Sequence, residues 1–268
     1  MRNIYKTFSL VIILISVFSS CSKKGCTDPM SLAYDVEASK DDGSCTYPEN
    51  VKKSLVFKVT ATWCPPCGDW GAEYVNNIYN DFSGNAEVVS VHDDSDFGVD
   101  IGYNLMSILN PTGVPSFYLG LDPMGNSGYG NVSDLISADL STTNQVSIAV
   151  EHSILDGNMI IKVQSQLENQ FSGDNCYLAL YLMEDGQVAP QQVSGVGEVV
   201  DYVHNHTLRT EANGSTFGLP IIFEDGKNLT EITAALAPST IWTHENLYVV
   251  AVIWQQNGSN YDFINLAR

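Results

Sequence analysis

The apolar and polar positions between residues 51 and 142 follow two periods in turn, which predicts alternating strands and helices. Residues 54–63, SLVFKVTATW, are rich in β-branched and apolar side chains and predict a strand. Residues 67–82 predict a helix, because aromatic or apolar side chains recur every fourth position, at Trp70, Tyr74, Ile78 and Phe82. The alternation continues with a strand at 86–92, a helix at 99–109, a strand within 111–120 and a helix at 131–140. This order predicts an α/β domain with a covered sheet.

The pattern changes after residue 142 to the alternation of half-buried strands. Apolar residues alternate on both sides of an Asp-Gly-Asn turn at 156–158, which predicts a β-hairpin. Residues 175–185 place Cys176 and three leucines on one strand face and two tyrosines on the other. Further strands are predicted at 215–223, 231–237 and 246–256, the last ending before GSNYDFINLAR. We expect a second domain, 143–268, to be an all-β immunoglobulin-like sandwich in which Cys176 is buried without a partner.

The N-terminal segment, residues 1–20, has the layout of a secretory signal peptide. A basic start is followed by an apolar run over 8–18, which is too short to span a bilayer. Cys21 directly follows Ser19 and Ser20, and this arrangement resembles a bacterial lipoprotein signal. The resemblance implies a lipid on Cys21, at the head of an exported segment 21–50. The alternative is an ordinary cleaved signal with an incidental cysteine.

The net charge of −19, from 31 acidic and 12 basic residues, limits the partners that the chain can bind. Such a charge argues against nucleic acid and against adsorption to anionic lipid, because both carry the same sign as the protein. Contact with the membrane is therefore expected through the N-terminal lipid. The charge has a simpler interpretation as well, which is solubility.

Residues 26–45, CTDPMSLAYDVEASKDDGSC, form an acidic segment bracketed by two cysteines. The segment is too small to bury a core, and export favours a Cys26–Cys45 disulfide that contributes about 3 kcal/mol. It resembles short acidic modules of secreted Bacteroidota-type proteins, in which the same CTDP and DDGSC ends recur. Its carboxylates are candidate Ca²⁺ ligands, although their spacing is not that of an EF-hand. The alternatives are a weak calcium site or a solvated spacer, and the candidate ligands are Asp28, Asp35, Asp41 and Asp42.

The stretch TATWCPPCGDW, residues 60–70, carries the candidate chemistry. Cys64 is expected at a helix N-terminus, where the helix dipole favours a thiolate, as the exposed attacking sulfur. Cys67, one turn later, is expected to be shielded and to resolve the mixed disulfide. A structural zinc site needs four ligands, and a second CxxC is absent. We expect His92 to be a surface residue at a strand end.

A CxxC pair at a strand-to-helix turn, followed by Val114, Pro115 and Ser116 before a strand, resembles the thioredoxin superfamily over about residues 51–142. The resemblance implies a cis peptide at Pro115, beside the bound substrate. The sequence departs from the family at Lys58, because typical members keep a buried aspartate there. A lysine either depresses the thiol pKa or points to solvent, so the family's proton relay does not transfer. A passive disulfide remains the alternative to redox chemistry.

Residues 201–209, DYVHNHTLR, place His204 and His206 two positions apart, and a strand would put them on one side. The hypotheses are a metal site or a packed, hydrogen-bonded segment in which Arg209 pairs with an acidic neighbour. Together with the lipoprotein signal and the thioredoxin-like half, the segment resembles the outer-membrane protein 28 family over most of residues 51–268. That resemblance implies a lipoprotein anchored to the outer membrane. Ser22, Lys23 and Lys24, in place of an acidic run, favour its periplasmic side.

Two functions of different classes follow from these features. In the first, the chain is a membrane-tethered thiol–disulfide oxidoreductase in which Cys64, Cys67 and Pro115 form the site and the β-domain positions client proteins. In the second, it is a surface binding or adhesion lipoprotein whose disulfide is structural. The partners are accordingly protein thiol and disulfide clients or surface partners, with no nucleic acid. No cofactor is expected beyond Ca²⁺ at the acidic segment.

Overall fold

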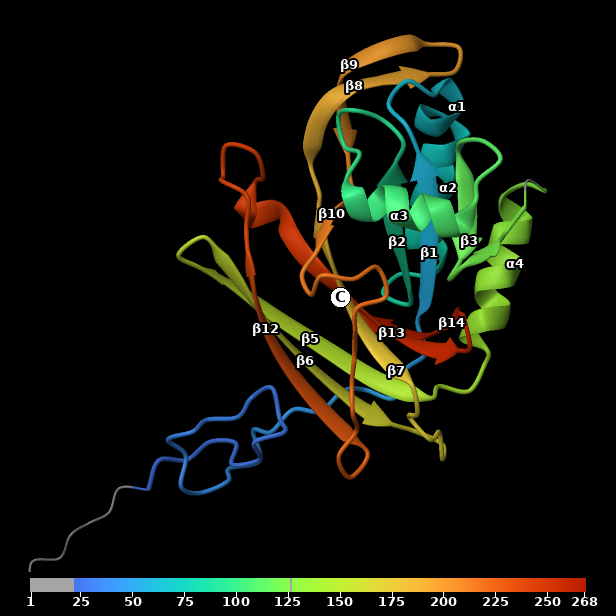
Figure 1. Cartoon of the computed structure of the whole chain (residues 1–268). Helices are drawn as coiled ribbons and strands as arrows, with labels where there is room; N and C mark the ends of the chain where they lie inside the picture. The colour runs from blue at the N-terminus through green and yellow to red at the C-terminus, as the bar shows by residue number, and fades with distance from the viewer. Residues whose placement is uncertain (1–21, 126) are drawn as a thin grey trace, which may run out of the picture.

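A computed structural model describes residues 22–125 and 127–268, so the predicted signal and Cys21 lie outside the described residues. The fold is rich in β-structure and is built on one mixed sheet of nine strands, in the order β14-β13-β7-β10-β2-β1-β3-β4, with β11 paired to β7 (Figure 1). None of the helices in the described ranges has both the length and the apolar character needed to cross a membrane.

The first half contains all four α-helices of the described residues, and it confirms the predicted alternation. Its elements are β1 (Ser54–Thr60), α1 (Pro65–Gly68), α2 (Trp70–Asp81), β2 (Ala86–His92), α3 (Asp100–Leu109), β3 (Ser116–Leu119), β4 (Asp122–Pro123) and α4 (Tyr129–Leu140). The helix predicted at 67–82 is interrupted at Asp69, whose backbone φ of −102° and ψ of −109° is not helical. Cys67 therefore sits in a separate short helix, α1, and Cys64 directly precedes it.

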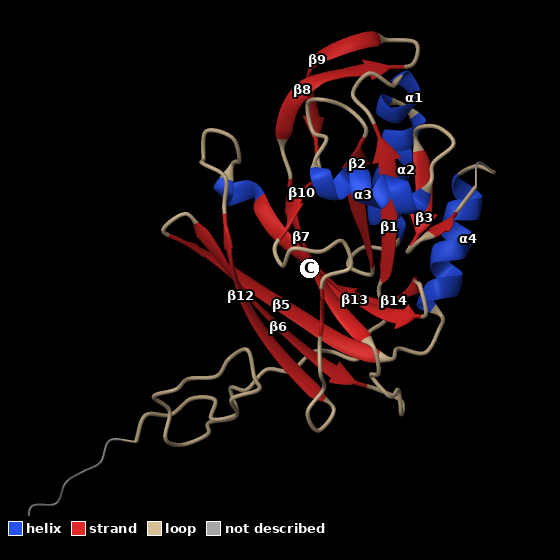
Figure 2. Cartoon of the chain, in the orientation of Figure 1, coloured by secondary structure: helices blue, strands red, loops and turns tan. Residues whose placement is uncertain are grey.

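Helices cover both faces of the β1–β2 part of the sheet (Figure 2). On one face, Ile101 and Leu105 of α3 pack in a core with Phe57. On the other face, Ile78 of α2 and Ile136 of α4 pack in a separate core with Val56 and its neighbours. The alternation of β1 thus divides its side chains between two apolar cores, as expected for a strand buried on both faces.

The second half is antiparallel apart from one strand pair. Its elements are β5 (Val146–Leu155), β6 (Asn158–Leu167), β7 (Cys176–Glu184), β8 (Gln187–Val193), β9 (Gly197–His204), β10 (Thr207–Glu211), β11 (Leu219–Pro220), β12 (Lys227–Ala235), η1 (His244–Asn246), β13 (Leu247–Asn257) and β14 (Asn260–Ala267). A three-stranded sheet, β12-β6-β5, packs on β7 and β13. The predicted division of β7 into two faces is confirmed, because its leucine face belongs to this core and its tyrosine face belongs to the core that includes α3.

The second half differs in three places from what the sequence alone indicated. Residues 215–223 supply only the two-residue β11, because Gly218 has a φ of 79° and packs against the backbone of Leu178. The last residues form a further strand, β14, which pairs with β13. The segment 201–209 is not one strand, because His206 has a φ of 59° and separates β9 from β10.

The β10 strand joins the two halves. Thr207 pairs with Ser90 of β2 in parallel, while the rest of β10 pairs with β7 in the antiparallel sense. The larger sheet therefore continues across the predicted boundary at residue 142, and the division into two domains stays a prediction.

Strands β8 and β9 form a two-stranded sheet of their own. This hairpin, residues 187–204, rises next to α1 at the end of the first half (Figure 1). We call it the covering hairpin, because it lies over the CxxC turn.

Candidate functional site

The CxxC pair lies where β1 ends. Cys64 is the N-cap of α1 with an extended backbone, and it forms a disulfide with Cys67 across a Cα–Cα distance of 5.3 Å. The amide of Cys67 donates to the carbonyl oxygen of Cys64 at 3.1 Å, which closes the turn. Pro65 and Pro66 occupy the first helical positions, where the missing N–H groups cost no intrahelical bond. The same two prolines remove two donors that could face a thiolate, so the expected dipole effect is weaker than in an ordinary helix.

A cis peptide bond lies beside the disulfide. The Val114–Pro115 bond is cis, and the carbonyl oxygen of Val114 lies 3.4 Å from Sγ of Cys64. Gly71 allows this approach, because a Cβ at that position would come within 2.9 Å of the Pro115 ring. The structure therefore brings together all three predicted residues of the site.

The exposure expected for Cys64 is wrong. Cys64 and Cys67 are each 2% exposed, because the covering hairpin packs on the turn. The side-chain amide of Gln191 donates to the carbonyl oxygens of Cys64 and Ala61, at 3.1 and 3.3 Å. The amide of Gln192 donates to the Thr62 carbonyl oxygen at 2.8 Å. The disulfide is therefore shielded from solvent, in part by the covering hairpin.

The fit between hairpin and turn depends on Gly68. A Cβ at Gly68 would lie 2.6 Å from the carbonyl oxygen of Gln192 and 2.7 Å from the Gln191 side chain. Trp63 is the large apolar side chain that stays outside this contact. It is 58% exposed, and its Nε1 donates to the carbonyl oxygen of Asp93 at 2.9 Å. Trp63 thus offers an aromatic surface directly before the buried pair.

Lys58 does not point to solvent. Its side chain lines a cavity of about 190 Å³ beneath the CxxC turn, together with Cys67, Ser90 and His92. The residue is 8% exposed, and burial lowers the pKa of its amine to about 8. The alternative in which Lys58 is a solvent-facing lysine is therefore excluded, and the amine lies in the same cavity as Cys67.

His92 is also buried, contrary to the surface position predicted for it. Its Nδ1 lies 3.0 Å from Oδ2 of Asp94, and burial lowers the pKa of the imidazole in spite of this partner. Burial acts to raise the pKa of Asp94, but the hydrogen bond and charge of His92 and two backbone amides outweigh it and lower that pKa to about 2. His92 and Asp94 thus form a fixed pair at the edge of the cavity.

His204 and His206 line the same cavity. His204 ends the strand β9, whereas His206 has a left-handed backbone with a φ of 59°. His204 packs on Phe97, with ring centroids 4.8 Å apart, and burial lowers its pKa to about 4. His206 stacks on Tyr79 at 4.4 Å, and burial lowers its pKa as well. Arg209 pairs with Glu184 at 3.2 Å, as the alternative to a metal site predicted.

The acidic segment is held by a Cys26–Cys45 disulfide. Its four candidate ligands are engaged separately: Asp28 accepts from Tyr47 at 2.6 Å, Asp35 pairs with Lys23 at 2.9 Å, and Asp41 and Asp42 accept backbone amides of their own turn. Across the described part of the chain, no group of three or more His, Cys, Asp or Glu side chains is arranged to hold a metal ion. Calcium binding stays a prediction.

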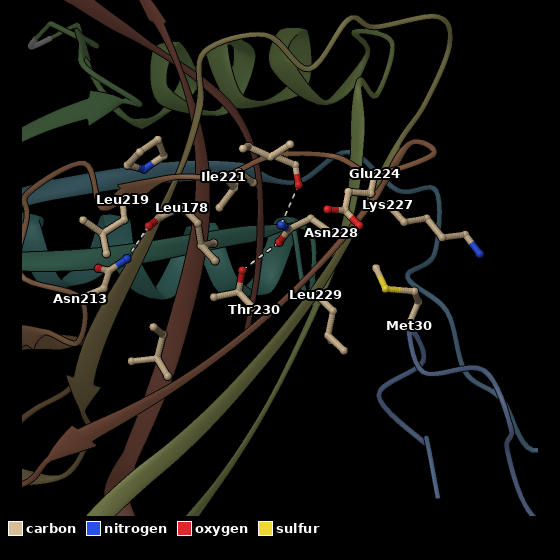
Figure 3. A pocket seen from close by; sticks show the side chains of 13 residues that line it. Met30, Leu178, Asn213, Leu219, Ile221, Glu224, Lys227, Asn228, Leu229 and Thr230 are labelled. Atoms are coloured by element: carbon tan, nitrogen blue, oxygen red, sulfur yellow. Dashed lines mark hydrogen bonds between the residues drawn. The ribbon is translucent and has the colours of Figure 1, made fainter. Parts of the chain in front are cut away.

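A second and larger cavity, of about 430 Å³, lies in the second half between β12, the segment around β11 and the acidic segment (Figure 3). Its walls are largely apolar, with Met30 reaching in from the acidic segment. The amide of Asn213 donates to the Leu178 carbonyl oxygen at 2.6 Å, and that of Asn228 donates to Ile222 at 2.9 Å. The lining contains no cysteine or histidine, and its two charged side chains are Glu224 and Lys227.

No feature of the sequence indicates that Gln191 and the covering hairpin pack on the CxxC turn. A glutamine in an alternating strand is an ordinary residue, and its partners are backbone atoms 127 and 130 positions away. The burial of His92 could have been inferred, because SVH continues the apolar alternation of β2.

Comparison with known proteins agrees with the outer-membrane resemblance. No curated protein sequence matches the chain. Among solved structures, HBP35 of Porphyromonas gingivalis is similar with a TM-score of 0.66 at 16% identity, over 82% of this chain and 75% of that one, which shows a shared fold. A domain of the outer membrane lipoprotein Omp28 from Porphyromonas gingivalis aligns at 16% identity over 46% of this chain and 88% of that one, with a TM-score of 0.32. The family described as outer membrane protein Omp28 matches residues 104–267. The chain belongs to this Omp28 family of outer membrane proteins.

Proposed function

We propose that the chain is an exported outer-membrane lipoprotein whose first half is thioredoxin-like and exchanges disulfides with client proteins through Cys64 and Cys67. The observation that carries this proposal is the position of Cys64 Sγ, 3.4 Å from the carbonyl oxygen at the cis Val114–Pro115 bond. An extended client backbone lying along that bond would place its own cysteine next to Cys64. A passive staple needs no such neighbour.

The exchange runs in two balanced steps from the disulfide state. A client thiol gives up its proton, and its thiolate attacks Sγ of Cys64. A client–Cys64 bond forms as the Cys64–Cys67 bond breaks, and Cys67 leaves as a thiolate that takes up a proton. A second client thiolate then attacks the client sulfur of the mixed disulfide, and Cys64 leaves. The client loses two electrons and the pair gains them; the reverse sequence reduces a client.

The covering hairpin gives this site a closed state. Its contacts include hydrogen bonds at Gln191, Gln192 and Ser194, the last donating to Pro65 at 3.2 Å, and the packing of His204 on Phe97. Opening would break these hydrogen bonds, which contribute about 0.5–1.5 kcal/mol each, and would separate His204 from Phe97. Client binding would therefore accompany opening of residues 187–204, and Trp63 would be the first apolar contact.

A second candidate is favoured by the burial of both sulfurs. In this alternative the pair is a structural disulfide that fastens the β1–α1 turn under the hairpin, and the protein is a surface binding or adhesion lipoprotein. The apolar cavity of about 430 Å³ would then be its binding space.

Four finer expectations remain proposals alongside the site. The second half is immunoglobulin-like in general shape, with β10 added to the sheet of the first half. A lipid on Cys21 anchors the protein on the periplasmic side. Its partners are protein thiol and disulfide clients rather than nucleic acid. The acidic segment binds Ca²⁺, and a heat of binding when Ca²⁺ is titrated into the whole protein, lost in a D41N/D42N variant, would support this.

A trapping experiment separates the two candidates. In reduced Cys67→Ser protein, the thiolate of Cys64 should attack a labelled peptide disulfide and remain as a stable mixed disulfide, because no resolving sulfur is present. The matched Cys64→Ser protein should form none, since Cys67 lines the internal cavity and it is Cys64 Sγ that lies beside the Val114 carbonyl oxygen. Equal labelling of both variants, or of neither after prolonged incubation, would favour the structural disulfide.

A further inference from the structure

The buried amine of Lys58 has no counter-charge. It extends from the middle of β1 into the cavity beneath α1 and α2, and it is 8% exposed. No acidic side chain of residues 22–125 or 127–268 raises the pKa of this amine; burial alone acts on it and lowers the value to about 8. At neutral pH the amine therefore carries its proton in a place where unpaired charge is unfavourable.

The cavity around this ammonium is lined by polar side chains that the pairing of β1 with β2 places on one face. Lys58 pairs with Ser90 and Thr60 pairs with His92 across the β1–β2 ladder, so these four side chains lie together on one sheet face. The same face is apolar further along, where Val56 packs under α2 and α4. Asn76 of α2 and Tyr202 of β9 complete the walls, and all of these residues line one space of about 190 Å³.

The carboxylates near this cavity are already engaged. Asp94 is held by His92 and accepts the amides of Thr62 and Phe97, at 2.9 and 2.8 Å. Asp185 pairs with Arg268 at 3.1 Å and also accepts the amide of His206. Neither is free to turn toward Lys58, so in the oxidised protein, where Cys67 carries no charge, these carboxylates do not supply the missing negative charge.

We propose that the cavity between β1, β2, α2 and β9 binds a small monovalent inorganic anion of the halide class, with the Lys58 ammonium as its counter-ion. A single positive charge favours a monovalent anion, because the neighbouring histidines are neutral at pH 7. The hydroxyls of Ser90 and Thr60 and the amide of Asn76 are available donors for its remaining hydrogen bonds. The volume of about 190 Å³ accommodates a halide with bridging waters and excludes large organic anions.

The site goes beyond the proposed exchange chemistry and does not depend on it, although Cys67 lines the same space. The test therefore uses oxidised full-length protein, in which no Cys67 thiolate competes with the anion. Chloride is the probe, and the readout is broadening of the chlorine NMR line. Sodium gluconate keeps the ionic strength constant.

We expect wild-type protein to broaden the chloride line in a saturable manner that bromide competes away. In Lys58→Met the saturable line broadening should be at least tenfold smaller. The matched control is Lys162→Met, because Lys162 also lies on a strand, but its side chain is 45% exposed and pairs with Glu231 at 3.4 Å. Absence of saturable broadening in the wild type, or its persistence in Lys58→Met, would overturn the proposal.

Two measurements on the wild type apply if Lys58→Met does not fold. The broadening should disappear as the pH rises from 7 to about 10, when Lys58 loses its proton. The other facing groups do not reverse this: His92, His204 and His206 are neutral throughout, and Tyr202 has a raised pKa. Crystals grown with bromide should show an anomalous peak within hydrogen-bond reach of Lys58 Nζ. Broadening that is independent of pH, or bromide peaks confined to the surface, would contradict the site.

Discussion

The side-chain amide of Gln191 donates to the carbonyl oxygen of Cys64 at 3.1 Å, although the two residues are 127 positions apart. The contact links the second half of the chain to the sulfur pair of the first, and it keeps both sulfurs 2% exposed. Part of the cover over the disulfide therefore comes from β8, which lies outside the CxxC turn.

Gln191→Ala should make the disulfide easier to reach. The change removes the two hydrogen bonds that the Gln191 side chain donates to the turn, which together correspond to about 1–3 kcal/mol. We expect reduction by dithiothreitol to become about tenfold faster, as followed by mass change after alkylation. Gln192→Ala is the matched control, because the Gln192 side chain bonds outward to Glu198 at 3.1 Å. An unchanged rate in Gln191→Ala would mean that the hairpin does not limit access.

Lys58 should make stability rise with pH above neutrality. Its pKa falls from 10.5 in the unfolded chain to about 8 in the fold, so the unfolded state holds more protons between these values. The unfolding free energy should therefore increase from about pH 8 upward by as much as about 3 kcal/mol. The unfolding free energies of wild type and Lys58→Met are measured with urea in the same low-halide buffer as a function of pH. Their difference isolates the contribution of Lys58, because tyrosines that titrate in this range contribute to both proteins. Parallel curves for the two proteins would show that the lysine is not buried.

His204 should make the protein sensitive to mild acid. Burial lowers its pKa from 6.5 to about 4, so the unfolded state takes up a proton first as the pH falls through this window. The full effect amounts to about 3 kcal/mol of unfolding free energy, present above pH 6.5 and lost by about pH 4. Thermal unfolding of His204→Gln should decline less steeply over that range than the wild type. His152 is exposed, so His152→Gln should follow the wild-type profile and serves as the control.

Loss of the Cys26–Cys45 disulfide should affect only the acidic segment. The body contacts it through few groups, including Gln164, which donates to the Met30 carbonyl oxygen at 2.5 Å, and Lys227, which lies 3.9 Å from Asp28. Cys26→Ser/Cys45→Ser should lose about 3 kcal/mol of local stability and become sensitive to protease within residues 26–45. The melting temperature of the remainder should stay within a few degrees. A large fall in that temperature would show that the segment is part of the main core.

Much of the first half followed from the sequence, since period and turn residues are local signals. The bounds of β2 match the predicted strand, and the Val114–Pro115 element lies beside Cys64 as the resemblance implied. The ends of the strands in the second half were harder to predict from the sequence. Gly218 packs on the Leu178 carbonyl and ends β11 early, and this contact is set by tertiary packing rather than by local propensity.

The burial of the site could not be predicted for a physical reason. Whether Cys64 is exposed depends on a hairpin more than 120 residues later, and Gln191 has no feature that marks its partner. Lys58 was recognised as a departure, but its direction depended on the packing of α2 and β9 around it. Long-range contacts between polar groups leave little trace in a single sequence.

The reduction potential of the Cys64–Cys67 pair tests the proposed exchange most directly. It is measured by equilibrating the whole protein with defined ratios of oxidised and reduced dithiothreitol and counting free thiols by mass. An exchange site should have a potential above about −300 mV, within reach of cellular thiol carriers. A value below about −300 mV would contradict exchange and identify the pair as a structural disulfide.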